Sequence, residues 1–353
     1  MKTLLKILTC WVIIQYDMIR VGINGFGRIG RNVMRAILER GNHDINVTRV
    51  NDLGELHTNL HLLKYDSAHG RLNTETFVYP EGDCKPNSKV GTWFRLGNDN
   101  LYHNKIWYTR QRDLTDWNVD VLIDCTGIHT DGDVFRNNTH RTIISAPAKN
   151  VDRTVVYGIN HKDITEDDQV ISNASCTTNC IAWLADIVHK NFGLRNGFMN
   201  TVHAYTSDQV LVDSYHNDRY RARSAANNII PTKTGAAETV AKILPALEGR
   251  LTGFATRVPV QNVSMLDFTF TTERPCTKIE IKDRLWAREN EYFGFETDKC
   301  VSSDYMGDPR SCIVDWNQYQ TLDEYSHRLD ARYDNEWTCA NRIVDLIEYV
   351  KRF

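Results

Sequence analysis

Two cysteines, Cys176 and Cys180, stand four residues apart in the stretch SNASCTTNC, where the sequence predicts the start of a helix. Ile181, Leu184 and Val188 share one face of that helix, so Cys176 falls at its amino-terminal edge. The unpaired amides of a helix start carry partial positive charge, which lowers the pKa of a thiol and favours the reactive thiolate. We therefore expect Cys176 to be a nucleophile and Cys180, one turn further in, to be an inert buried thiol.

A nucleophilic thiol needs a base, and the segment TVHAYT offers His203 on a predicted strand. On pattern alone, a strand histidine is more often structural than catalytic, so both interpretations of His203 stay open at this point. Cys176 and Cys180 could also pair as a disulfide under oxidative stress. A metal site is disfavoured because no second close Cys or His pair completes four ligands. The sequence therefore predicts thiol chemistry and no metal.

A second candidate site lies near the amino terminus, where INGFGRIG spaces Gly25, Gly27 and Gly30 as GxGxxG between a predicted strand and a predicted helix. In dinucleotide-binding folds these glycines allow a tight turn, close approach of the backbone to a pyrophosphate, and close helix packing. Asp52 follows at the end of the next β-rich run, where a carboxylate would bind an adenosine ribose and repel a 2′-phosphate. A lone GxGxxG is often only a glycine-rich turn, but this context favours NAD.

The elements around these residues fall into two classes along the chain. From residue 19 to about 175, short β-branched runs alternate with helical segments, which predicts a doubly wound parallel sheet of the Rossmann type. The later part shows alternating apolar runs, which predict an α+β catalytic domain with a mixed, largely antiparallel sheet and one face covered by helices. We place the NAD-binding domain at 18–175 and 334–353, and the catalytic domain at 176–333.

Composition limits the classes of partner and compartment. A chain of 353 residues suits two domains, and a formal charge of −3 provides no field that would draw the molecule to nucleic acid or an anionic membrane. Nine irregularly spaced cysteines indicate reduced thiols, as in a cytoplasm. Residues 1–17 contain a short apolar run, which we interpret as an extension ahead of a natural start at Met18, with a membrane tether as the minor alternative.

Several longer motifs carry a family resemblance that runs from Met18 to the carboxyl terminus. They are NGFGRIGRNV, HLLKYDSAHGRL, IISAPAKN, SNASCTTNC, TVHAYT, IIPTKTGAAETVAKILPALEGRLTGFATRVPVQNVS and YDNEW, in that order. Together they closely resemble phosphorylating glyceraldehyde-3-phosphate dehydrogenase of the bacterial type. The resemblance implies an NAD-dependent enzyme in which Cys176 attacks glyceraldehyde 3-phosphate, His203 takes the thiol proton, and inorganic phosphate releases 1,3-bisphosphoglycerate from a thioester.

The resemblance also assigns binding residues by position. The substrate phosphate would be held by Thr206 and Arg257, with Arg221 serving both anions. The attacking phosphate would be held by Ser175, Thr177, Thr234 and Gly235. The cofactor contacts would be Asn24, Gly25, Phe26, Gly27, Arg28, Ile29, Gly30, Asp52, Thr126, Gly127, Ser145 and Asn335. Singly, several of these residues could be helix starts, solvated charges or turn caps; as an ordered set they favour the functional interpretation.

Some residues differ from the family pattern, and other functions remain as alternatives. Trp183 stands where the family commonly has proline, and Arg328, Asp330 and Arg332 replace a more apolar run, which leaves the local packing open. A loop at 207–231 resembles the family's S-shaped loop and implies a homotetramer. The alternatives are erythrose-4-phosphate dehydrogenase and, in another class, a non-catalytic NAD-binding redox sensor that also binds RNA.

Overall fold

The computed structural model describes residues 18–42, 44–79, 91–97, 105–113, 115–136 and 140–353. The chain divides into two compact units. The first contains residues up to Arg153, with Thr165–Ser172 and Ile343–Phe353, and the second contains Thr154–Ile164 and Asn173–Arg342. The proposed extension at residues 1–17 lies outside the described residues. Within the described ranges, no helix has the length and apolar character needed to cross a membrane.

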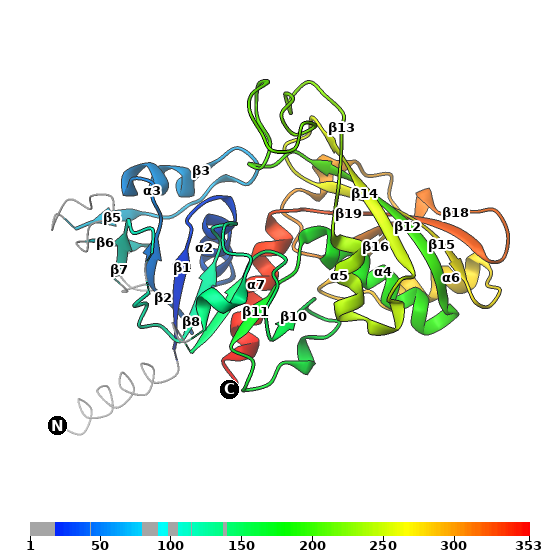
Figure 1. The fold of residues 1–353 in the computed structure, drawn as a ribbon, viewed down its shortest axis with the longest axis horizontal. Coiled ribbons are helices and arrows are strands. Elements are labelled where there is room, and N and C mark those ends of the chain that lie inside the picture. Colours follow the sequence, from blue (N-terminus) through cyan, green and yellow to red (C-terminus); the bar gives the residue numbers. More distant parts are fainter. Residues whose placement is uncertain (1–17, 43, 80–90, 98–104, 114, 137–139) are drawn as a thin grey trace. The chain divides into compact units, whose positions relative to one another are not determined.

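The first unit is built on a nine-stranded sheet in the order β10-β11-β9-β8-β1-β2-β7-β6-β5 (Figure 1). Its strands are β1 (Ile19–Asn24), β2 (Ile45–Asn51), β5 (Thr76–Val78), β6 (Thr92–Leu96), β7 (Ile106–Thr109), β8 (Val121–Asp124), β9 (Arg141–Ile144), β10 (Arg153–Thr154) and β11 (Val170–Ser172). The run from β11 to β7 is parallel, whereas β6 and β5 add an antiparallel edge. The predicted parallel sheet is confirmed.

Two helices follow the first two strands of this unit, α2 (Arg28–Arg40) after β1 and α3 (Leu56–Lys64) after β2. Helix α2 ends at Gly41, whose φ of 66° provides the left-handed conformation common after a helix. The short pair β3 (Tyr65–Asp66) and β4 (Gly70–Arg71) follows α3. The carboxyl-terminal residues of the chain also belong to this unit, because Arg40 pairs with Asp345 at 2.6 Å.

Strand register brings the carboxyl ends of the central parallel strands to one edge. Asn24, the last residue of β1, pairs in register with Asn51 of β2 and with Asp124 of β8. Asp124 pairs in turn with Ile144 of β9. The residues that come next in the chain are the predicted cofactor residues, so one edge of one sheet gathers them, as is usual in doubly wound folds.

The second unit contains an eight-stranded mixed sheet in the order β13-β14-β12-β15-β19-β17-β16, with β18 paired to β19. Its strands are β12 (Leu194–Ala204), β13 (Ile230–Thr232), β14 (Leu251–Val258), β15 (Ser264–Thr272), β16 (Phe293–Glu296), β17 (Cys312–Asp315), β18 (Gln320–Thr321) and β19 (Ser326–Tyr333). Only β12–β14 and β16–β17 pair in parallel among these described strands. The expected mixed, largely antiparallel sheet is therefore confirmed.

Helices cover one face of this second sheet. They are α4 (Cys176–Phe192), α5 (Ala236–Ile243) and α6 (Lys278–Trp286), and they lie on the same side of the strands (Figure 1). Alternate residues of β12, such as Met199, Thr201 and His203, are buried on the helical side, while Phe198 is exposed on the other. Helix α4 is buried along nearly its whole length, so its first residue is held rigidly against the sheet.

The two departures from the family have local explanations. Trp183 is almost completely buried and stacks on Phe293, with ring centroids 5.7 Å apart. Space for the indole comes from Gly158, where a Cβ atom would lie 2.3 Å from the Trp183 ring. On β19, Arg328 makes a two-pronged pair with Asp267 of the neighbouring strand, with both contacts at 2.9 Å. Arg332 and Asp330 of the same strand form an ion pair with each other, so the additional charges have partners within the sheet.

Candidate active site

Cys176 is the first residue of α4, as the sequence predicts. Ser175 caps this helix, because its hydroxyl accepts a hydrogen bond of 3.0 Å from the amide of Thr178. The Cys176 Sγ lies 3.5 Å from Nε2 of His203, within the reach of a thiol–imidazole hydrogen bond. Cys180 is fully buried in the core of the unit, as expected for a thiol one turn inside the helix.

His203 lies near the end of β12 and is 5% exposed. Its Nδ1 lies 2.7 Å from its neighbour's carbonyl, Ala204 O, and also 2.7 Å from Nη1 of Arg257. The parallel register of β12 and β14 explains the second contact, because it pairs His203 with Arg257 directly. One strand therefore supplies the imidazole, and its neighbour supplies a cation beside it.

The protonation states differ from the sequence-based expectation. Burial raises the pKa of the Cys176 thiol, although the Arg257 charge and hydrogen bonds with Thr177 act in the opposite direction. Burial, followed by the positive charge of Arg257, lowers the pKa of His203 to about 3. The prediction that the helix start keeps the sulfur ionised is wrong for this arrangement, because desolvation disfavours the charged forms more strongly than the neighbouring cation and amides favour the thiolate. Burial thus opposes the charged form of both side chains, the thiolate of Cys176 and the imidazolium of His203.

Tyr333, at the end of β19, was missed in the sequence analysis. Its hydroxyl lies 2.9 Å from Oγ1 of Thr177 on α4 and 2.8 Å from Oγ1 of Thr201 on β12. Its ring meets the His203 ring edge to face, with centroids 6.1 Å apart. The fully buried tyrosine thereby links the helix that carries the cysteine to the strand that carries the histidine. The motif YDNEW contained this residue, but only strand pairing indicates where it points.

Arg221 and Arg257 bring positive charge to the same place. The charge of Arg221 contributes to lowering the pKa values of both His203 and Arg257, so the guanidinium groups act on a common region. Arg221 donates a hydrogen bond of 3.0 Å to Oγ1 of Thr232 and forms an ion pair with Asp208. Two arginines beside a nucleophile can hold oxyanions by paired hydrogen bonds.

The remaining predicted phosphate residues occupy loops and helix starts of the same unit. Thr206 follows β12 in the loop after His203. The hydroxyl of Thr234 accepts a hydrogen bond of 3.3 Å from the amide of Ala236, and Gly235 is the cap residue of α5, with no side chain to cap it. Thr234 and Gly235 therefore do start a helix, which was the structural alternative for them, and their amides and hydroxyl surround its amino-terminal end.

Asn335 is 5% exposed and follows β19 by two residues. Its side-chain oxygen accepts a hydrogen bond of 3.0 Å from the hydroxyl of Ser264. The adjacent Asp334, rather than Asn335, caps the final helix α7 (Trp337–Val350), since its carboxylate accepts from the amide of Trp337 at 2.8 Å. The capping role that was the structural alternative for Asn335 is therefore performed by Asp334.

In the first unit, the glycine-rich turn has the geometry that a dinucleotide needs. Gly25 has a φ of 86°, and a Cβ atom on Gly30 would lie 2.1 Å from the carbonyl of Gly25, so both positions require glycine. Gly27 is the cap residue of α2 and has no side-chain cap, while a Cβ atom there would meet nothing within 4 Å. The start of α2, with Arg28 and Ile29 in its first turn, can therefore approach a pyrophosphate.

A polar network supports the carboxyl ends of the strands around this turn. Asn24 donates to Asp124 at 2.8 Å and accepts from Asn51 at 3.0 Å. Asp124 also accepts from the hydroxyl of Thr126 at 2.8 Å, and its backbone oxygen accepts from the amide of Ser145 at 2.9 Å. Asp124 is buried, which raises its pKa. The sequence analysis named three of these residues as cofactor contacts but missed Asp124 and Asn51, which fix their orientation.

Asp52 and Arg28 already have partners within the first unit. The Asp52 carboxylate accepts hydrogen bonds from the amide of Phe26 at 2.8 Å, from the amide of Gly54 at 2.7 Å and from Asn59 at 3.1 Å. A carboxylate offers about four acceptor sites, so capacity for a ribose hydroxyl remains. Arg28 forms an ion pair with Asp66, which orients it at the start of α2. Gly127, with a φ of 69°, shapes the turn after β8.

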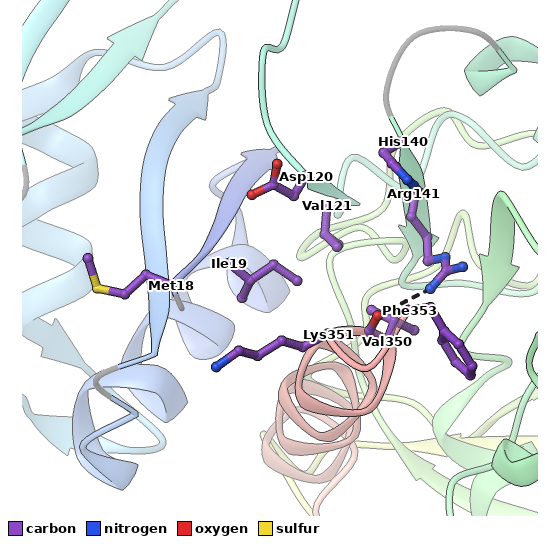
Figure 2. Close-up of a pocket in the computed structure, with 9 residues that line it drawn as sticks. All are labelled: Met18, Ile19, Asp120, Val121, His140, Arg141, Val350, Lys351 and Phe353. Atoms are coloured by element: carbon purple, nitrogen blue, oxygen red, sulfur yellow. Dashed lines mark hydrogen bonds between the residues drawn. The ribbon is translucent and has the colours of Figure 1, made fainter. Parts of the chain in front are cut away.

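A cavity of about 300 Å³ in the first unit is a separate feature (Figure 2). It lies at the amino ends of the parallel strands, where Ile19 begins β1 and Arg141 begins β9, and thus opposite the predicted cofactor edge. Arg141 donates hydrogen bonds to the carbonyls of Asp168 and Val350, and Lys351 pairs with Asp44 at 3.0 Å. Arg141 and Lys351 therefore stabilise the fold of this unit through these contacts.

Comparisons with known proteins agree with both units. Residues 19–132 match the family model described as the NAD binding domain of glyceraldehyde 3-phosphate dehydrogenase. Residues 175–335 match the C-terminal domain of the same family. The first unit is accordingly an NAD-binding domain of this family.

Curated relatives extend the similarity over almost the whole chain. Glyceraldehyde-3-phosphate dehydrogenase of Cereibacter sphaeroides is 43% identical over 336 residues, covering 93% of this chain and 97% of the relative. The chromosomal enzyme of Cupriavidus necator is 45% identical over 343 residues, with coverage of 93% and 97%. That of Pseudomonas aeruginosa is 42% identical over 336 residues, with coverage of 93% and 96%. The chain belongs to the glyceraldehyde-3-phosphate dehydrogenase family and is an NAD-dependent oxidoreductase.

Proposed function

We propose that this chain oxidises glyceraldehyde 3-phosphate through a covalent intermediate on Cys176, with inorganic phosphate as the second substrate. The observation that carries the proposal is the 3.5 Å contact between Cys176 Sγ and His203 Nε2, beside Arg257 and Arg221. The names of the curated relatives support the three-carbon aldehyde over erythrose 4-phosphate. NAD, when bound, supplies the hydride acceptor.

The burial of the pair suggests how the first step proceeds. Burial raises the pKa of the thiol and lowers that of the imidazole, which favours transfer of the thiol proton together with the attack on the aldehyde. Sγ attacks the carbonyl carbon as its proton passes to Nε2 of His203, and the imidazolium then stabilises the oxygen that gains negative charge. The same histidine can return a proton when phosphate displaces the thioester.

The residues around the dyad support roles for two oxyanions. Arg257 and Thr206 would hold the phosphate group of the aldehyde, and Arg221 would serve both anions. Ser175, Thr177, Thr234 and Gly235 are suited to the attacking phosphate, because they lie at or next to the starts of α4 and α5. Within the second unit, Asn335 is the candidate for orienting the nicotinamide amide.

A burst experiment tests this function. Mixing purified protein with NAD and glyceraldehyde 3-phosphate, without phosphate, should give one rapid equivalent of NADH per active subunit, followed by steady turnover when phosphate is added. Erythrose 4-phosphate in a parallel mixture should turn over more slowly. A missing burst would favour the non-catalytic sensor, and steady turnover without phosphate would overturn the thioester route.

We also propose a homotetramer. The loop at 207–231 exposes large apolar side chains, among them Leu211, Tyr215 and Ile229, and the uncovered face of the second sheet exposes Phe198 and Phe254. Clustered exposed apolar residues mark interaction surfaces. Light scattering coupled to size exclusion should give four times the chain mass, and a monomer would contradict the proposal.

A further inference from the structure

The carboxylate of Asp52, the expected contact of the adenosine ribose, is held from two sides. Its Oδ2 accepts a hydrogen bond of 2.8 Å from the amide of Phe26, which lies in the glycine-rich turn. Its Oδ1 accepts from the amide of Gly54 at 2.7 Å and from Nδ2 of Asn59, on α3, at 3.1 Å. Donors from the turn after β1 and from α3 therefore fix the orientation of this carboxylate.

A buried tyrosine fixes the side chain of Asn59 in turn. The hydroxyl of Tyr108, on β7, accepts from Nδ2 of Asn59 at 2.8 Å and donates to the carbonyl of Gly54 at 2.8 Å. Tyr108 is fully buried and Asn59 is 6% exposed, so these bonds are shielded from water. Because a carboxylate can only accept, the amide nitrogen of Asn59 must face Asp52, and its two N–H groups serve Asp52 and Tyr108.

Gly54 allows this network to close. A Cβ atom on Gly54 would lie 2.8 Å from Oδ1 of Asp52 and 2.9 Å from Nδ2 of Asn59, which is closer than such atoms pack. Any side chain at position 54 would therefore displace the carboxylate, the amide or both. The loop after β2 is thus fitted to the contact between Asp52 and Asn59.

The network leaves little choice of partner for Asp52. An ionised carboxylate has no donor and about four acceptor positions. The N–H groups of Phe26, Gly54 and Asn59 occupy three of these positions. A ribose hydroxyl can donate to the position that remains, whereas a 2′-phosphate brings only negative charge and further acceptors. A carboxylate that cannot turn away must therefore repel the phosphate.

The fixed orientation matters because a cation lies close to the same loop. Nε and Nη2 of Arg110 donate to the carbonyl of Leu53, the residue after Asp52, at 3.1 and 2.8 Å. An arginine near this point of a dinucleotide-binding domain can accommodate a 2′-phosphate. If the Asp52 carboxylate could move aside, the remaining charge would therefore favour binding of NADP as well as NAD.

We propose that Asn59 and Tyr108 are positioning residues for the choice of cofactor. They hold the Asp52 carboxylate in the orientation that accepts a ribose hydroxyl and refuses a 2′-phosphate. This inference rests on the proposed function and on the expected ribose contact of Asp52, and it deepens them. It assigns the discrimination between NAD and NADP to a buried hydrogen-bond network together with the carboxylate that the network supports.

Equilibrium binding tests the proposal without turnover. Calorimetric titration of the purified protein with NAD and with NADP gives the ratio of the two dissociation constants. Asn59→Leu leaves the Tyr108 hydroxyl bonded to Gly54 and should shift this ratio about tenfold towards NADP, as expected for one hydrogen bond to a charged group. Asp52→Ala should shift the ratio further, and Tyr108→Phe should shift it less. An unchanged ratio in Asn59→Leu, beside a shifted ratio in Asp52→Ala, would overturn the proposal.

Two further variants separate positioning from a general loosening of the fold. Gly54→Ala displaces the contact between Asp52 and Asn59 without removing a buried side chain, and it should shift the ratio in the same direction. Thr58→Val is the matched control on α3, because the hydroxyl of Thr58 bonds to Glu55 at 2.9 Å, and this variant should keep the wild-type ratio. Equal shifts in Thr58→Val and Asn59→Leu would mean that loosening α3 is sufficient, and the proposal would fail.

The titrations also distinguish this proposal from those on which it rests. If Asp52→Ala left the ratio unchanged, the expected ribose contact would be wrong, and the role of the network would fall with it. A missing NADH burst with NAD and glyceraldehyde 3-phosphate would instead contradict the proposed function. The dissociation constants are measured without aldehyde, so they do not depend on that burst.

Discussion

The second unit contains two Cys–His contacts, and only one of them has the surroundings of a catalytic pair. Cys176 Sγ and His203 Nε2 are 3.5 Å apart, whereas Cys276 Sγ and His327 Nε2 are closer, at 3.2 Å. The second pair joins the loop before α6 to β19. A short distance between a thiol and an imidazole is therefore insufficient to identify an active site.

The difference lies in what surrounds each pair. His327 is 2% exposed, its Nδ1 lies 2.9 Å from the hydroxyl of Tyr319, and Phe270 packs against its ring. Cys276 is 3% exposed, so no substrate-sized molecule reaches it. By contrast, Cys176 is partly exposed at a helix start, and the positive charge of the partly buried Arg257 acts on it. Access and fixed positive charge, more than contact distance, distinguish the candidate site.

The largest difference between the two pairs is expected when each cysteine is replaced by serine. Cys176→Ser should lower turnover by about a thousandfold or more, because a serine hydroxyl beside a weakly basic imidazole is a poor nucleophile. Cys276→Ser should retain turnover near the wild-type level. Steady-state assays, with NAD binding as the control for folding, measure both. Comparable losses in the two variants would refute the assignment of the nucleophile.

Replacing the histidines tests the second member of each pair. His203→Asn should reduce the acylation rate by about a hundredfold, the lower end of what a positioned base contributes. His327→Asn should leave that rate within a small factor but lower the free energy of unfolding by about 1–3 kcal/mol, since Tyr319 loses a buried partner. Burst kinetics and urea unfolding separate the two effects. An acylation defect in His327→Asn would place both pairs in the mechanism.

The two cysteines should also differ in how their alkylation depends on pH. Burial raises the pKa of Cys176 above its ordinary value, so the thiolate fraction at neutral pH is small. Its reaction with iodoacetamide should therefore accelerate about tenfold per pH unit from 7 through 9, while Cys276 stays protected in the folded protein. Mass spectrometry of each cysteine peptide gives both rates. A plateau for Cys176 below pH 7 would indicate a preformed thiolate, as first expected from the helix start.

The cofactor edge could be predicted from the sequence to a greater extent than the catalytic site. The glycine spacing and Asp52 lie within one strand–helix–strand segment, so local rules predicted their geometry. The helix-start position of Cys176 was also local. By contrast, the contact of Arg257 with His203 depends on the register of β12 and β14, which the sequence pattern does not determine.

The protonation state was the main failure of the sequence analysis, and its cause is physical. A pattern shows that Cys176 starts a helix, but the cost of desolvating a charge depends on everything packed around the sulfur. Tyr333 was missed for a related reason: it comes 157 residues after Cys176 and reaches the site only through the pairing of β15 with β19. The sequence pattern therefore locates Cys176, whereas the pKa of its thiol depends on packing between segments that are far apart in the chain.

The smallest expected effect comes from two tyrosine hydroxyls. Tyr333→Phe leaves the hydroxyls of Thr177 and Thr201 without their shared partner and loosens the link between α4 and β12, so acylation should fall severalfold. Tyr319→Phe removes the hydroxyl that contacts His327 in the other pair and should change only stability. Each variant should lose about 1–3 kcal/mol of unfolding free energy, which makes them matched controls for each other. Because the expected stability losses are similar, a difference in burst rate between the two variants isolates the positioning of Cys176 against His203. Equal burst rates would mean that Tyr333 has only a structural role, as Tyr319 has beside Cys276 and His327.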